Sequence, residues 1–136
     1  MDDLIAFLNA RFDEDEAAAQ AAARDTERFA GRANWSAAFG TIVTDAEDPG
    51  WAICDLAPFV DDECLARHIA RHDPARVLRE VAAKRAILAE YERVAGSAQA
   101  YPNNATITSL GAAQTVVKAL GTVYSDHPDY RGEWAP

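Results

Sequence analysis

Cys64, His68 and His72 combine metal-binding residue types with the spacing of a single helical face. They follow one another at intervals of four residues, so a helix would present all three on one side. One thiolate and two imidazoles suit zinc, and two histidines one turn apart can bind the same ion. At a rise of ~1.5 Å per residue, Cys64 and His72 lie about 12 Å apart, so only neighbouring pairs can share an ion. Zinc on this face is one hypothesis, and two surface histidines beside a packed cysteine are the alternative.

No set of residues in the sequence has the spacing of a known catalytic site. The segments around Cys54 and Cys64 do not resemble that of a nucleophilic cysteine with a histidine base. The glycines are isolated and form no phosphate-binding loop. The acidic run at residues 13–16 is typical of a solvated helix face. We therefore predict no catalytic residue and no cofactor besides the zinc of the first hypothesis, and we favour a non-enzymatic protein.

Basic residues gather between residues 67 and 85 and form a second candidate site. Arginines at helical spacing can bind phosphates, so nucleic-acid binding through Arg67–Arg85 remains an alternative. The stretch lacks the aromatic residues that stack on bases, and the acidic first helix offers partners for these charges. The candidate interaction residues, which also include two aromatic residues of the C-terminal tail, are Arg67, Arg71, Arg76, Arg79, Tyr130 and Trp134.

The charge of the chain is strongly acidic and unevenly distributed. Of its 136 residues, 49% are hydrophobic and 26% charged, which is the composition of a globular domain. The net charge is −9; residues 1–65 carry −11 and residues 66–136 carry +2. A strong negative field repels nucleic acids and anionic membranes, so neither is a favoured partner.

The cysteine content and the apolar runs indicate a protein of the cytoplasm. Two cysteines are too few for a disulfide framework, so we expect both thiols to be reduced. The acidic N-terminal segment lacks the basic region of a signal peptide. No apolar run approaches the roughly 18–20 residues of a membrane-spanning helix. We therefore expect a cytoplasmic location and no membrane association.

The first half of the chain predicts a helix followed by a β-hairpin. Apolar residues at helical spacing, then an alanine-rich run, predict a helix over residues 1–30. Two β-branched or apolar runs around the turn at Pro49-Gly50 predict a hairpin over residues 38–56. The large residues expected in the core are Leu4, Leu8, Phe12, Phe39, Ile42, Trp51, Ile53, Val77, Val81 and Leu88.

The second half predicts three more helices and a tail. Residues 61–95 form a helix–break–helix, broken at Asp73-Pro74, where an aspartate can cap the second helix. A linker rich in small residues follows, and a weakly amphipathic helix covers residues 105–124. We expect residues 125–136 to run extended over the surface, held by Tyr130 and Trp134.

Three blocks of the sequence together resemble one known family. They are residues 1–16 (MDDLIAFLNARFDEDE), residues 68–88 (beginning HIARHDPARVLREVAAKR) and residues 124–134 (YSDHPDYRGEW). The family consists of small uncharacterised proteins of actinobacteria and their phages and is known only as a domain of unknown function. The resemblance implies no activity, substrate or catalytic residue.

The sequence as a whole predicts a single helix-dominated α+β domain over residues 1–136. An apolar seam in the helix before residue 95, and hairpin edges that need covering, favour a protein-interaction or regulatory module. We expect a protein partner or self-association into a homo-oligomer, in a phage-related or regulatory setting. A zinc-binding protein and a nucleic-acid binder are the alternatives.

Overall fold

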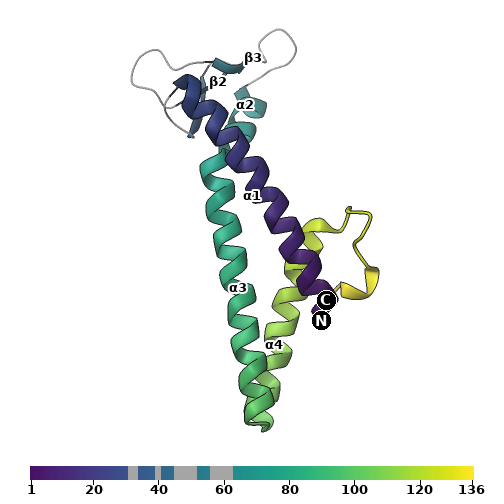
Figure 1. The fold of residues 1–136 in the computed structure, drawn as a ribbon. Coiled ribbons are helices and arrows are strands. Elements are labelled where there is room, and N and C mark those ends of the chain that lie inside the picture. Colours follow the sequence, from purple (N-terminus) through teal and green to yellow (C-terminus); the bar gives the residue numbers. More distant parts are fainter. Residues whose placement is uncertain (31–33, 39–40, 45–51, 56–62) are drawn as a thin grey trace. The chain divides into compact units, whose positions relative to one another are not determined.

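The computed structural model describes residues 1–30, 34–38, 41–44, 52–55 and 63–136 (Figure 1). Within these ranges four helices dominate, and three short strands form one sheet. The helix-dominated α+β class predicted from the sequence is therefore confirmed. In chain order the elements are α1 (Asp2–Ala30), β1 (Trp35–Ala38), β2 (Thr41–Thr44), β3 (Ala52–Asp55), α2 (Glu63–Arg71), α3 (Pro74–Ala100), α4 (Asn104–Gly121) and the 3₁₀ helices η1 (Thr122–Tyr124) and η2 (Gly132–Trp134).

The chain divides into two compact units, which we describe separately. The terminal unit contains residues 1–14 and 81–136, and the sheet unit contains residues 15–80. The helices α1 and α3 each contribute to both units. The prediction that residues 1–136 form one domain stays a prediction.

The sheet unit is built on a three-stranded antiparallel sheet in the order β1-β2-β3. Trp35 of β1 pairs with Thr44 of β2, and Thr41 pairs with Asp55 of β3. The pair β2–β3 lies within the predicted hairpin, whereas β1 was not predicted. Alanine is poorly represented in strands, so the Trp-Ser-Ala-Ala sequence of β1 gives little β signal. Helix α2 packs against β1 and β2. An isolated hairpin is only marginally stable, and here strand β1 and helix α2 stabilise the β2–β3 hairpin.

The register of β2 and β3 decides which apolar side chains the sheet buries. Ile42 is buried, as expected, and its cross-strand partner is Cys54. The register shifts between Ile42 and Val43, so Ile53, between Ala52 and Cys54, has no partner residue on β2. Ile53 is 40% exposed, so its predicted place in the core is wrong.

The break between α2 and α3 is the one predicted from the sequence. The Asp73 carboxylate accepts a hydrogen bond from the Arg76 backbone N–H at 2.6 Å, which caps the first turn of α3. Arg76 Nη1 also donates to the backbone oxygen of Arg71 at 3.1 Å, at the last residue of α2. Pro74 begins α3, where its missing N–H costs nothing.

The turn between α3 and α4 lies later than expected, because Gly96 does not end α3. The helix continues to Ala100 and stops before Pro102. The first turn of α4 is capped by Asn103, whose side chain accepts from the backbone N–H groups of Ala105 and Thr106. Thr106 Oγ1 accepts in return from the Asn103 N–H at 3.0 Å, which completes a capping box.

The core of the terminal unit lies where the start of α1 meets α3 and α4 (Figure 1). Gly121 at the end of α4 packs so closely on Leu4 that a Cβ there would lie 3.1 Å from a Leu4 methyl carbon. Of the large residues expected in a core, the two units bury Leu4, Leu8, Phe12, Ile42, Val81 and Leu88. Val77 is half-buried, and Phe39 and Trp51 lie outside the described residues.

The C-terminal segment folds back onto α1 through turns rather than running extended. Backbone hydrogen bonds from His127 to Tyr124 and from Tyr130 to His127 close successive turns before η2. Trp134 is buried with its ring centroid 5.1 Å from that of Phe7, and the Tyr130 ring lies 6.2 Å from Phe7. The two predicted anchors therefore hold the tail, although its extended form was a wrong expectation.

Candidate functional site

Helix α4 exposes a surface that carries no charge. Its only charged residue is Lys118, which is half-buried and donates to the backbone oxygen of Ala135 at 3.2 Å. We call the ten exposed residues of α4 the α4 surface; they are Asn104, Ala105, Ile107, Thr108, Ser109, Gly111, Ala112, Thr115, Val116 and Ala119.

The composition of the α4 surface differs from that of an ordinary solvated helix face. Solvent-facing sides of helices are normally rich in charged residues, and 26% of this chain is charged. The α4 surface instead consists mostly of alanine, glycine, serine and threonine, with Ile107 and Val116 59% and 48% exposed. Depletion of charge marks the centres of protein–protein interfaces, and small side chains let a second helix approach closely.

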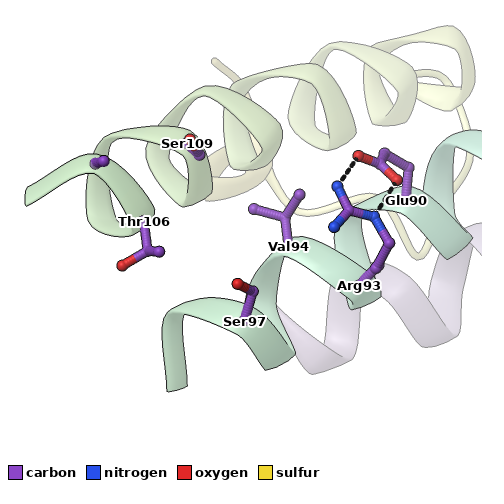
Figure 2. A pocket seen from close by; sticks show the side chains of 7 residues that line it. Glu90, Arg93, Val94, Ser97, Thr106 and Ser109 are labelled. Carbon is purple, nitrogen blue, oxygen red and sulfur yellow. Dashed lines mark hydrogen bonds and ion pairs between the residues drawn. The ribbon is translucent and has the colours of Figure 1, made fainter. Parts of the chain in front are cut away.

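Two adjoining pockets lie between α3 and α4 and extend this surface. The apolar pocket has a volume of about 360 Å³, and Ile87 and Val116 are its large exposed side chains. The polar pocket, of about 380 Å³, includes Ser97, Thr106 and the side chain of Val94 between α3 and α4 (Figure 2). Glu90 lines both pockets, which makes them neighbours along the seam of the two helices.

Glu90 and Arg93 form a bidentate ion pair at the edge of the polar pocket. Arg93 Nε and Nη2 donate to the two carboxylate oxygens of Glu90 at 2.7 and 2.6 Å (Figure 2). The hydrogen bond from Arg93 lowers the pKa of the Glu90 carboxyl, and the same bond raises the pKa of Arg93. The ion pair of Glu90 therefore stabilises the folded chain at pH values above the ordinary pKa of a glutamate. This stabilisation is lost as the pH falls through the lowered pKa that Glu90 has in the folded chain. Because water screens exposed pairs, that contribution is small.

Cys64 and His68 lie on α2 and His72 directly follows its last residue, and all three side chains are exposed. The rings of His68 and His72 are one turn apart, with centroids 5.0 Å from each other. Cys64 is a free thiol one turn earlier. Among the described residues, no three or more histidine, cysteine, aspartate or glutamate side chains gather as a metal site would require. Zinc binding by a neighbouring pair stays a prediction.

The four candidate arginines lie in the sheet unit, two on α2 and two on α3. Arg76 binds Glu80 at 2.6 Å besides its contact with the end of α2, so its guanidinium has a structural role. Arg67 and Arg71 on α2 and Arg79 on α3 are exposed. Nucleic-acid binding through them stays a prediction.

Part of the basic stretch pairs with the acidic first helix, as the charge distribution indicated. Arg85 Nη2 lies 2.6 Å from Asp13 Oδ1, within the terminal unit. Lys84 Nζ donates to the Tyr124 hydroxyl at 2.9 Å and lies 5.7 Å from the centroid of the Phe12 ring. These two basic side chains therefore stabilise the packing of α3 in the terminal unit.

Tyr130 and Trp134 line a third pocket, of about 520 Å³, together with Arg11 of α1. Arg11 Nη2 donates to Glu14 at 2.7 Å, and Arg11 Nη1 contacts His127 Nε2. Sequence reasoning missed Arg11, because 116 residues separate it from His127 and no local spacing relates them. Only the folding of the tail onto α1 brings them together.

Comparison with protein-family models gives one match, which covers residues 1–136 in full, to a "Family of unknown function (DUF6221)". The chain belongs to this family. The DUF6221 match supports the expectation of a domain of unknown function that the three sequence blocks raised. No curated protein and no solved structure matches the chain.

None of the described helices is both long enough and apolar enough to cross a bilayer. The cytoplasmic location stays a prediction.

Proposed function

We propose that the chain is a protein-interaction module that self-associates through the α4 surface. The observation that carries this proposal is the lack of charge on all ten exposed residues of α4. Water solvates such a surface less favourably than a surface that carries charged side chains. Covering it with a second helix removes the apolar parts of Ile107 and Val116 from solvent.

The occupant that fits this surface is a second copy of the same chain. Each copy carries a net charge of −9, so two copies repel each other across most of their surfaces. Contact through α4 brings no like charges face to face, because neither α4 surface is charged. A two-fold axis through this contact would place the same residues on both sides, as in most homodimers.

The chemistry of the α4 surface favours close packing of two helices. Alanine, glycine, serine and threonine have short side chains, so two helices can approach to about 8 Å between axes. Ile87 of α3 and Val116 of α4 provide larger apolar side chains at the edge of this contact. A regulatory or phage-related role for the resulting dimer is part of the proposal and is supported only by the sequence resemblance.

The test compares two substitutions that add the same charge to exposed helical alanines. Ala112 belongs to the α4 surface, and Ala89 is exposed on α3 and lines neither α3–α4 pocket. We expect the wild-type chain and Ala89→Glu to dimerise with similar dissociation constants. Because Ala112→Glu would place two carboxylates in the interface, we expect its dimerisation to be weaker by about tenfold or more, about 1.4 kcal/mol. Sedimentation equilibrium over a range of concentrations measures this.

Two results would contradict the proposal. One is a wild-type chain that remains monomeric at the highest soluble concentration. The other is an equal weakening by Ala89→Glu and Ala112→Glu, because added charge alone would then account for the effect. Circular dichroism of both variants checks that the helices are retained.

A further inference from the structure

Arg11 is a mostly buried arginine whose donor groups have too few acceptors. Its side chain is 11% exposed and lies over the Phe7 ring, 5.4 Å from the centroid. A guanidinium has five N–H donors. Nη2 donates to Glu14, but Nε is buried and has no hydrogen-bond partner among the described residues. A buried donor without an acceptor is costly, so this position favours the binding of an acceptor.

The contact of Arg11 with His127 does not supply that acceptor. The Asp129 backbone N–H donates to His127 Nδ1 at 3.1 Å, so Nδ1 acts as an acceptor. Nε2 is the atom that contacts Arg11 Nη1, so this contact engages Nη1 and leaves the buried Nε without an acceptor among the described residues.

The pocket beside Arg11 combines this donor with aromatic walls. It has a volume of about 520 Å³ and is lined by residues of α1 and of the C-terminal segment. Phe7, Tyr130 and Trp134 provide ring surfaces, and the Tyr130 and Trp134 rings meet edge to face at 5.8 Å. A flat apolar group can stack on such rings.

The acidic residues that line the pocket repel an anion only weakly, because one is paired and the other is exposed to solvent. Asp3 is paired with Arg131, whose Nη1 lies 2.8 Å from its carboxylate, and the Arg131 guanidinium lies over the Trp134 ring. The Asp129 side chain is exposed to solvent, where its charge is screened. Of the two cationic residues that line the pocket, Arg11 is the one with a buried donor that lacks an acceptor among the described residues. Glu14 already neutralises part of its charge.

We propose that this pocket binds a ligand in which an oxyanion is attached to a flat apolar group. The oxyanion accepts from the Arg11 guanidinium, and the flat group stacks on the aromatic side chains that line the pocket. Carboxylates and phosphates share this chemistry, because both present two or more acceptor oxygens to a guanidinium. The inference is independent of the α4 surface.

Titration of the full ¹⁵N-labelled chain with benzoate and with phenyl phosphate tests the proposal by NMR. We expect at least one of them to shift both the Arg11 Nε–H and the Trp134 indole N–H signals. Acetate and inorganic phosphate carry the same charged groups without the ring, and we expect them to bind at least several-fold more weakly. The two aromatic probes distinguish a carboxylate ligand from a phosphate ligand.

Arg11→Gln should weaken binding about tenfold or more, since hydrogen bonds to charged groups contribute about 1.5–3 kcal/mol. Arg93→Gln removes an equally charged side chain from an exposed pair and should leave binding unchanged. If Arg11→Gln fails to fold, the shifts of the Arg11 and Trp134 signals in the wild-type chain still test whether the pocket binds the probes. Failure of both aromatic probes to shift Arg11 and Trp134, unchanged binding in a folded Arg11→Gln, or equal binding without the ring would each overturn the proposal.

Discussion

Trp134 is the side chain that fixes the C-terminal segment to α1. It is buried against Phe7 and also contacts Tyr130 and Arg131. Because truncation removes these contacts and leaves a cavity, we expect Trp134→Ala to lower the free energy of unfolding by about 3 kcal/mol. Urea denaturation followed by circular dichroism measures the change.

Tyr101 offers the matched aromatic control for that experiment. It lies in the turn between α3 and α4 and is 74% exposed. Tyr101→Ala should change the free energy of unfolding by less than about 0.5 kcal/mol. Similar losses from the two variants would show that the tail adds little to stability.

At the level of single residues, the sequence predicts which side chains of a helix are buried, because their periodic spacing is local. It does not predict contacts between residues that are far apart in the chain. The apolar stripe of Leu4, Leu8 and Phe12 predicted the buried face of α1, because i, i+4 spacing is a local property. Ile53 was wrongly placed, since its exposure depends on the register of β3 against β2. The contact of Arg11 with His127 has no local signal at all.

The end of α4 depends on a glycine that cannot be enlarged without displacing its neighbours. A Cβ at Gly121 would lie 3.1 Å from Leu4, whose side chain is fully buried and cannot move aside freely. Overpacking of this kind costs about 1–3 kcal/mol, more than the roughly 0.5–1 kcal/mol that alanine gains over glycine in a helix. We expect Gly121→Ala to destabilise the chain by about 1 kcal/mol in denaturant titrations.

Gly96 provides the control at the same residue type. It lies within α3, and a Cβ there meets no described atom within 4 Å. Gly96→Ala should therefore stabilise the chain by about 0.5–1 kcal/mol. Equal gains from the two substitutions would contradict the close packing of α4 on α1.

At the level of elements, termini with a strong local signal were predicted and weaker ones were not. Asp73-Pro74 marked the start of α3, because a capping carboxylate and a first-turn proline act within a few residues. Gly96 was taken as the end of α3, but favourable residues on both sides carry the helix through one glycine. The cap at Asn103 was missed, since threonine rather than glutamate stands at its third helical position.

The uncharged α4 surface could have been found in the sequence, whereas its exposure could not. Residues 104–121 contain one charged residue, which is visible in the sequence. Such a helix is ordinarily buried, and only the structure shows that α1 and α3 cover just one side of it. The candidate site thus follows from the structure, in which a helix with the composition of a buried element has one side exposed.

At the level of the whole molecule, net charge opposes the proposed dimer. Two chains of −9 repel each other, and salt shortens the range of that repulsion from about 10 Å at 0.1 M to about 3 Å at 1 M. We therefore expect the dimer dissociation constant to fall several-fold between about 0.1 M and about 1 M sodium chloride. Sedimentation equilibrium at the two salt concentrations provides the measurement.

The opposite salt dependence would indicate a different kind of contact. Ion pairs across an interface weaken as salt is added, and so does binding to nucleic acids. A dissociation constant that rises with salt would therefore contradict an interface made by the uncharged α4 surface. It would favour exposed arginines such as Arg67 and Arg71 instead.

The terminal unit joins the first residues of the chain to its last ones. Residues 1–14 pack with residues 81–136, and Trp134 rests on Phe7. During synthesis at ~5–20 residues per second, the stripe of Leu4, Leu8 and Phe12 waits roughly 6–24 s for its final partners. Over that time the most apolar face of α1 is open to chaperones and to neighbouring nascent chains. The same contacts that complete the fold therefore make its assembly a late event.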